Sequence, residues 1–125
     1  MSKILIVEDD KNILKALCIR LHARGYEIVT AQDAVSATVT AARENPDLVL
    51  LDISLPAGNG FEVARKLREE PRFVELPLVF LTASRRPGLR DKAEELDAAG
   101  FFEKPYDATE LVARIDELLA GAPAR

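Results

Sequence analysis

Hydrophobic residues along the chain fall into five short runs that are separated by longer amphipathic stretches. The runs are Ile4–Val7, Tyr26–Thr30, Leu48–Leu51, Leu78–Leu81 and Gly100–Phe102. They are rich in Ile, Val, Leu and Phe without strict alternation, which is typical of parallel strands buried on both faces. Because each run is followed by a helical stretch, the pattern predicts an α/β domain in which helices cover both faces of a five-stranded parallel sheet.

The stretches between the runs have the spacing of amphipathic helices. The apolar face of the first is formed by Ile13, Leu14, Leu17, Cys18 and Leu21, and that of the last by Leu111, Val112, Ile115, Leu118 and Leu119. Sequence signals also indicate where helices begin and end. We expect C-caps at Gly25 and Gly100, helix ends at Asn45-Pro46 and Glu70-Pro71, capping boxes at Asn59/Glu62 and Asp107/Glu110, and Pro87 in a first turn.

The size and charge of the chain narrow its class. Its 125 residues fit one domain, which we expect to span residues 1–120, with a flexible C-terminal tail at 121–125. A net charge of −4 without a basic stripe argues against nucleic-acid binding through this domain. No apolar run is long enough to cross a membrane, and Ile4–Val7 is too short for a signal peptide. The single cysteine, Cys18, fits a reducing compartment, so we expect a soluble, cytoplasmic protein.

Polar side chains follow four of the five runs. Glu8, Asp9 and Asp10 come after the first run, Asp52 after the third, Thr82 after the fourth, and Lys104-Pro105 after the fifth. Ligands of open α/β sheets bind beyond the carboxyl ends of the strands, where these residues are expected to meet. Acidic oxygens there suit a hard divalent cation, and a hydroxyl and an ammonium suit the oxygens of a phosphoryl group.

Each of these residues also has a purely structural interpretation. Asp10 fits the N-cap of the first helix, and we favour that role for it. Thr82 fits a turn, and Lys104 fits a solvated surface charge. Asp52 differs from them, because Ile53-Ser54-Leu55-Pro56 follows it and no helix begins there for its carboxylate to cap. A carboxylate that caps nothing at the end of a buried strand indicates a functional role.

A set of short motifs carries a resemblance to a known family. They are Ile4-Leu5-Ile6-Val7-Glu8-Asp9-Asp10, Leu50-Leu51-Asp52 with Leu55-Pro56, Asn59-Gly60, Leu81-Thr82-Ala83, Ala99-Gly100 and Lys104-Pro105. In order and spacing they resemble the receiver domain of two-component response regulators, and the resemblance runs from about Lys3 to Leu119. It implies a flavodoxin-like, doubly wound (βα)5 fold with strand order 2-1-3-4-5.

The resemblance assigns the acidic residues to phosphorylation and metal binding. Asp52 matches the phospho-acceptor of the family. Asp9 matches the acid that binds Mg²⁺ directly, and its neighbour Glu8 matches a ligand that acts through water. The backbone carbonyl of Ser54, two residues beyond the acceptor, would complete the protein's share of the Mg²⁺ ligands.

The remaining polar motifs match the parts of the family that respond to phosphorylation. Thr82 matches the switch hydroxyl, Lys104 the phosphate-binding lysine, and Phe101 the switch aromatic. The bond between Lys104 and Pro105 is expected to be cis. Strand alternation should place Phe101 and Phe102 on opposite sides of the last strand, so that one of them is a core residue.

The function implied by the resemblance is that of a signalling switch and not of an enzyme with a separate substrate. Asp52 would receive a phosphoryl group from a phosphohistidine on a sensor histidine kinase or a histidine phosphotransfer protein, with Mg²⁺ as the cofactor. The domain would catalyse only its own phosphorylation and autodephosphorylation. Partners, including a second copy in a homodimer, would read a face made by helix four, strand five and helix five. The downstream target is not identified by the sequence.

The chain departs from the family pattern at one loop. It has Ala57-Gly58-Asn59-Gly60 where the family usually has Asp before the last Gly, and Asn caps a helix equally well. Ser54 and Ser84 occupy the positions that tune the lifetime of the phosphoryl group. Both side chains are small and polar, and neither should strongly block an attacking water.

Three other functions compete with this interpretation. A phosphatase of the haloacid dehalogenase type needs a second Asp two residues after its nucleophile, where this chain has Ser54. A nucleotide- or flavin-binding domain needs a phosphate-binding loop where Glu8-Asp9-Asp10 would repel phosphate. An interaction module that needs no phosphorylation would lack any Mg²⁺-dependent labelling. A basic patch at Arg85, Arg86 and Arg90 is either a solvated surface or a contact for an acidic partner.

Overall fold

All five predicted runs form strands of one sheet. The computed structural model describes residues 1–120, and the tail expected at 121–125 lies outside the described residues. The strands are β1 (Lys3–Val7), β2 (Glu27–Ala31), β3 (Leu48–Asp52), β4 (Ser54–Leu55), β5 (Gly58–Asn59), β6 (Leu78–Thr82) and β7 (Gly100–Glu103). The helices are α1 (Lys11–Ala23), α2 (Ala34–Glu44), α3 (Gly60–Glu69), α4 (Leu89–Glu95) and α5 (Ala108–Leu119), with a short 3₁₀ turn, η1 (Pro71–Phe73).

The main sheet has the predicted order. Its strands run β2-β1-β3-β6-β7 and every pair is parallel, which corresponds to 2-1-3-4-5 when the small hairpin is left out. In such a sheet the order reverses between β1 and β3, and the crevice beyond the carboxyl ends of these two strands is where ligands bind. The fold therefore fixes the place of the site before any side chain is considered.

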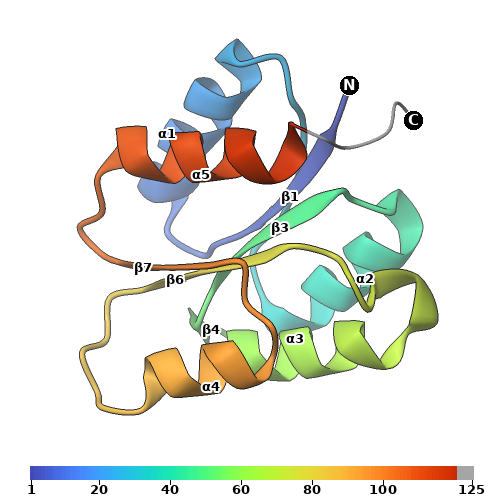
Figure 1. Cartoon of the computed structure of the whole chain (residues 1–125), viewed down its shortest axis with the longest axis vertical. Helices are drawn as coiled ribbons and strands as arrows, with labels where there is room; N and C mark the ends of the chain where they lie inside the picture. Colours follow the sequence, from blue (N-terminus) through green and yellow to red (C-terminus); the bar gives the residue numbers. More distant parts are fainter. Residues whose placement is uncertain (121–125) are drawn as a thin grey trace.

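Helices cover both faces of the sheet, as the hydrophobic pattern predicted. Figure 1 shows α1 and α5 on one side and α2, α3 and α4 on the other. Alternate residues of β1 point to the two sides, so that Ile4 and Ile6 pack with α1 and α5, whereas Leu5 and Val7 pack with α2 and α3. Since β1, β3 and β6 are apolar on both sides, they are almost completely buried.

Most of the predicted helix ends are confirmed. Asp10 caps α1 and accepts hydrogen bonds from the amides of Asn12 and Ile13. Asn59 caps α3 and Asp107 caps α5 through bonds to backbone amides of the first turn. The remaining confirmed signals are the left-handed residues Gly25 (φ 91°) after α1 and Asn45 (φ 49°) after α2, and Glu70 as the C-cap of α3.

Two predicted helix signals are wrong, and both concern α4. Gly100 is no C-cap: α4 ends at Glu95 with Leu96 as its C-cap, Asp97 takes the left-handed conformation, and Gly100 begins β7. A Cβ on Gly100 would lie 3.3 Å from a methyl carbon of Val79, so close strand packing explains the glycine. Pro87 is not in the first turn either, because the N-cap is Gly88 (φ 87°) and the helix begins one residue later.

A small antiparallel hairpin follows the end of β3 and was not predicted. Ser54 pairs with Asn59 and Leu55 with Gly58, which turns the chain back toward the sheet before α3 begins. The turn uses Ala57 (φ 61°) and Gly58 (φ 137°) in conformations with positive φ. Among residues 1–120, no helix combines the length and the apolar character that a membrane crossing requires.

Candidate functional site

The end of β1 sends two neighbouring acids into different surroundings. Glu8 is completely buried, and one of its carboxylate oxygens accepts a hydrogen bond from the amide of Asp10 at 3.1 Å. Asp9 is exposed. Because β1 is a central strand, the residues that follow it lie beside the end of β3, as the strand order requires.

Asp52 is the last residue of β3 and lies almost fully inside the protein. It is 3% exposed, and its Oδ1 accepts a hydrogen bond from the amide of Ser54 at 3.1 Å. The start of α3 packs directly against its backbone. A Cβ on Gly60 would lie only 2.4 Å from the carbonyl oxygen of Asp52, and the Gly60 amide donates to Ile53 O at 2.8 Å. Only glycine at position 60 permits this approach.

Lys104 joins the two buried acids. Its Nζ lies 2.7 Å from Oε1 of Glu8 and 2.9 Å from Oδ2 of Asp52, and its side chain is 14% exposed. The Lys104 amide donates to the carbonyl of Thr82 at 2.7 Å, which holds the backbone of the lysine beside the end of β6. The peptide bond between Lys104 and Pro105 is cis, as expected.

Burial and charge together shift the ionisation of this pocket. Burial and the neighbouring Asp52 raise the pKa of Glu8 to about 7, although Lys104 and the Asp10 amide oppose the shift. Burial alone would lower the pKa of Lys104, but its hydrogen bonds to Glu8 and Asp52 outweigh that effect, and the pKa is raised. The lysine is therefore a fixed cation, whereas ionised Glu8 carries an energetic cost.

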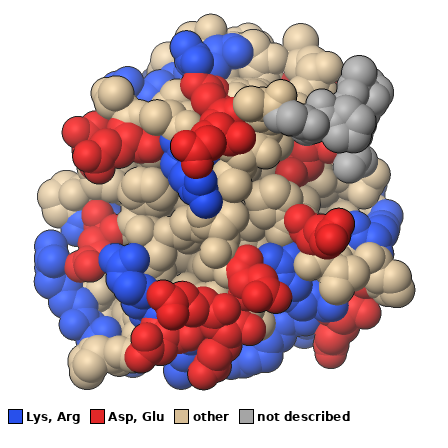
Figure 2. Space-filling model, in the orientation of Figure 1, with Lys and Arg blue, Asp and Glu red and all other residues tan. Residues whose placement is uncertain are grey.

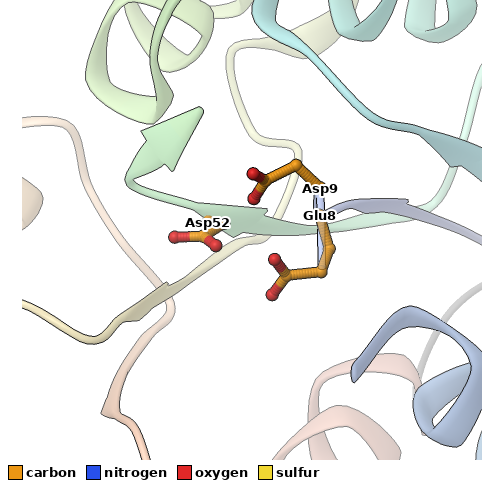
Figure 3. Close-up of side chains that lie close together, drawn as sticks. All are labelled: Glu8, Asp9 and Asp52. Atoms are coloured by element: carbon orange, nitrogen blue, oxygen red, sulfur yellow. The ribbon is translucent and has the colours of Figure 1, made fainter. Parts of the chain in front are cut away.

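The donor set fits a hard divalent cation. Glu8, Asp9 and Asp52 each offer an oxygen within 4.8 Å of the other two, and Figure 3 shows the three carboxylates turned toward one region beyond the ends of β1 and β3. Carboxylate oxygens are the ligands that Mg²⁺ prefers. Only Glu8 and Asp52 pair with the ammonium group of Lys104, so a cation beside the three acids would offset the repulsion among them.

The other predicted site residues lie around this pocket. Thr82 is fully buried, follows Leu81 (the register partner of Asp52), and its Oγ1 accepts from the Ser84 amide at 3.0 Å. Phe101 is half-buried and packs on the α4 side of the sheet, whereas Phe102 packs on the α5 side, which confirms the alternation. Ser54 is exposed and its amide contacts Asp52, and the role of its carbonyl stays a prediction.

Two contributors to the site were not recognised from the sequence. Gly60 was noted as part of a motif, but its close approach to Asp52 was not foreseen. The guanidinium carbon of Arg90 lies 4.6 Å from the centre of the Phe101 ring, and Arg90 had been assigned only to a surface patch. The sequence offers no signal for this stacking, because the two residues are brought together only when α4 packs beside β7.

The match to a family settles the class of the protein. Residues 4–116 match the family model described as Response regulator receiver domain. The chain belongs to this family. A receiver domain is a signalling module and not a classical enzyme, so the phosphatase and nucleotide-binding alternatives no longer apply.

Curated relatives support the same assignment. This receiver domain is 38% identical to Response regulator PleD of Caulobacter vibrioides. The match covers 94% of this chain and 26% of PleD. It is 34% identical to the Phosphate regulon transcriptional regulatory protein PhoB of Pseudomonas aeruginosa over 93% of its length, 51% of that protein. The chain thus spans about a quarter of the first relative and about half of the second.

Solved structures share its fold along nearly the whole chain. The chemotaxis protein CheY4 of Vibrio cholerae superposes with a TM-score of 0.87 at 27% identity, covering 95% of this chain and 99% of that one. The receiver domain of the sensor histidine kinase PA1611 of Pseudomonas aeruginosa, which has a magnesium ion coordinated in its active-site cleft, gives a TM-score of 0.86 at 25% identity. That match covers 96% of this chain and 98% of the other.

Proposed function

We propose that this receiver domain accepts a phosphoryl group on the carboxylate of Asp52. The observation that carries the proposal is the position of Asp52: it ends a buried strand, pairs with Lys104 and lies beside two further acids. The donor is a phosphohistidine on a sensor histidine kinase, the partner that a receiver domain implies, or on a histidine phosphotransfer protein. Because the chain spans only part of its relatives, the output of the whole protein is a separate question.

Mg²⁺ is the cofactor that the pocket would hold. Asp9, Asp52 and the carbonyl of Ser54 would be direct ligands, and Glu8 would act through water. When bound, the ion supplies positive charge that offsets the repulsion among the acids and the charge of the incoming phosphoryl group. The magnesium ion in the cleft of the PA1611 receiver domain supports this choice of metal.

The transfer itself uses Asp52 as a nucleophile. A carboxylate oxygen forms a bond to phosphorus while the bond between phosphorus and the donor imidazole nitrogen breaks, and the imidazole leaves with the electron pair of that bond. Lys104, whose Nζ lies 2.9 Å from Oδ2 of Asp52, is placed to bind an oxygen of the transferred group. Most of the catalysis is positioning and charge compensation.

The phosphorylated state is proposed to reach the surface through Thr82 and Phe101. The new phosphoryl oxygens draw in the hydroxyl of Thr82, and the ring of Phe101 rotates into the space that is vacated. This rotation changes the face made by α4, β7 and α5. Downstream binding and homodimer formation through this face stay predictions, as do the cytoplasmic location and the domain boundary at residue 120.

Labelling with a small phosphodonor tests the acceptor assignment. Acetyl phosphate and Mg²⁺ should add one phosphoryl group to the wild-type protein, measured by intact mass, and none to Asp52→Ala. Asp91→Ala, which removes an exposed aspartate of α4, is the matched control and should label like the wild type. Equal labelling of Asp52→Ala would refute the acceptor role, and no Mg²⁺-dependent labelling of any variant would favour the phosphorylation-independent interaction module.

A further inference from the structure

A small basic cleft lies beside the loop that joins β6 to α4. Its hollow measures about 120 Å³, and its charged lining consists of three arginines and one glutamate, namely Arg85, Arg86, Arg90 and Glu103. In Figure 2, Lys and Arg side chains gather at the lower left, where Figure 1 places this loop. The cleft is separate from the acidic pocket and has the opposite charge.

The arginines of the cleft already hold a carboxylate. Oε2 of Glu103 lies 2.9 Å from Nη1 of Arg85, and Oε1 lies 3.8 Å from Nη2 of Arg90. The side chains of Arg85 and Arg90 are 71% and 59% exposed, so their guanidinium groups also remain open to a ligand from outside. Exposed ion pairs of this kind are weak, and a second carboxylate can therefore compete with Glu103.

The cleft also orients its arginines before a ligand arrives. The guanidinium group of Arg90 stacks on the ring of Phe101, which leaves its N–H edge free to donate hydrogen bonds. Arg86 is held by Ser84, whose Oγ accepts from the backbone amide and from Nε of Arg86 at 3.2 and 3.3 Å. Fixed guanidinium groups bind carboxylates with a smaller loss of side-chain entropy.

Two chains of contacts connect the cleft with the phosphorylation site. The amide of Ser84 donates to Oγ1 of Thr82, so a shift of Thr82 reaches Arg86 through Ser84. The ring that supports Arg90 belongs to Phe101, the proposed switch aromatic. Both residues that the proposed function assigns to the switch therefore contact the cleft, directly or through one residue.

We propose that this cleft binds a carboxylate side chain on an acidic segment of a partner protein, and that Glu103 is an internal competitor for the same arginines. The inference names the chemistry of the partner that binds the face made by α4, β7 and α5, and to that extent it rests on the proposed function. Phosphorylation of Asp52 changes the affinity, because rotation of the Phe101 ring removes the surface against which Arg90 is oriented.

A protein carboxylate fits the cleft better than a nucleic acid does. The arginines are already paired with a carboxylate, and the hollow has the size of a side chain. Phosphates of a nucleic acid are bound by an extended basic stripe. Here α4 continues from the cleft with the exposed acids Asp91, Glu94 and Glu95, which repel a long polyanion.

The experiment uses a short fluorescent peptide of alternating Glu and Leu, with a peptide of alternating Gln and Leu as the control ligand. Fluorescence anisotropy measures affinity, and backbone amide shifts in ¹⁵N NMR spectra locate the contact. The Glu peptide should bind and shift residues 84–90, and the Gln peptide should bind at least about fivefold more weakly. Equal binding of both peptides, tighter binding of a single-stranded oligonucleotide, or self-association of the protein as the only event would overturn the inference.

Matched variants separate the cleft from general electrostatics. Arg85→Gln with Arg90→Gln should weaken binding of the Glu peptide about fivefold, and Glu103→Gln should strengthen it roughly threefold. Arg65→Gln with Lys66→Gln removes the same two charges from the exposed face of α3 and should leave the affinity unchanged. A loss as large in this control as in the Arg85/Arg90 double variant, or no gain in Glu103→Gln, contradicts the assignment.

The same samples distinguish this inference from the proposed function. Acetyl phosphate labelling of Asp52 is followed by intact mass while peptide affinity is measured on the labelled protein. Labelling without peptide binding refutes only the inference that the basic cleft binds a carboxylate. Peptide binding without labelling refutes only the acceptor role of Asp52. Labelling that leaves the affinity unchanged refutes the link between the cleft and the switch.

Discussion

The two edges of the sheet bury polar groups in opposite ways. At the amino edge, where strands begin, the charged groups of Arg68 and Asp47 are paired with backbone groups. At the carboxyl edge, where strands end, charged side chains face one another. The difference separates residues that hold the fold together from residues that are available for chemistry.

Arg68 shows how the amino edge is built. Its guanidinium group donates to four backbone carbonyls at 2.8 to 3.2 Å, those of Phe73, Leu76, Leu96 and Asp97. These carbonyls belong to the segments that precede β6 and β7, so one side chain joins α3 to the ends of η1 and α4. The side chain of Asp47 similarly accepts from the amide of Lys3 at 2.8 Å. Such groups are satisfied within the fold.

The carboxyl edge is built from charges that do not balance. Glu8 and Asp52 share the ammonium group of Lys104, and Asp9 adds a third carboxylate beside them. The raised pKa of Glu8 is the energetic sign of this imbalance. A site whose charges repel one another without a ligand favours binding of a cation, because the cation offsets the repulsion among the carboxylates.

The largest effect is expected from breaking the amino edge. Arg68→Ala leaves four carbonyls without their donor and should reduce the free energy of unfolding by about 3 kcal/mol. Arg65→Ala, an exposed arginine of the same helix, should change it by less than about 0.5 kcal/mol. Urea denaturation measures both. If Arg68→Ala lowered the free energy of unfolding no more than Arg65→Ala does, the bonds of Arg68 at the amino edge would not be what stabilises the fold.

The pH dependence of stability tests the carboxyl edge. The folded-state pKa of Glu8 is about 7, above its ordinary value of 4.5, so folded protein binds more protons than unfolded protein between these values. Without Mg²⁺, stability from this group is present below about pH 4.5 and is lost as the pH rises to about 7.

The difference between wild type and Glu8→Gln isolates this group from the other acids. Urea denaturation from pH 4.5 to 8 should show the wild type losing stability relative to the variant. Saturating Mg²⁺ should reduce the loss, because it favours the ionised carboxylates. A difference that stays flat without metal would show that burial of Glu8 is not costly.

The carboxyl edge was largely predictable from the sequence, and the amino edge was not. Residues that follow strands are identified as soon as the strands are, and parallel strands bring them to one place. Glu8, Asp52 and Lys104 are therefore found from local patterns, although they are far apart along the chain. Arg68 carries no such pattern, because its four acceptors are backbone carbonyls that no residue type reveals.

The two wrong helix signals and the contacts that were not predicted have the same physical origin, which is the surroundings of a residue in the fold. Gly100 was interpreted by its conformational freedom, whereas the fold requires its small size against Val79. Pro87 was assigned to a first turn by its own preference, but the neighbouring Gly88 determines where α4 begins. Contacts between elements, such as Arg90 on Phe101, depend on how helices pack and leave no trace in the spacing of residues.

Mg²⁺ should stabilise the protein through the carboxyl edge by a smaller amount. At ten times its dissociation constant, a ligand that binds only the folded state adds about 1.4 kcal/mol. Asp9→Asn removes one of the three acidic ligands and should abolish most of this gain in a thermal titration with MgCl₂. An unchanged titration would refute the ligand assignment of Asp9. Arg68→Ala, although less stable, should keep the full response.

The smallest expected effect is a gain in stability when a charge is removed from the carboxyl edge. Because Arg68→Ala at the amino edge lowers stability, this opposite sign is the most specific test of the comparison. Asp9→Asn removes a charge from an overcrowded cluster and should raise the melting temperature of the metal-free protein by about 2 °C. Asp10→Asn removes the neighbouring charge, but Asn continues to cap α1 and the residue lies outside the cluster, so no such rise is expected. Differential scanning calorimetry in EDTA measures both. A lower melting temperature in Asp9→Asn would mean that the cluster is balanced, and that the two edges do not differ as described.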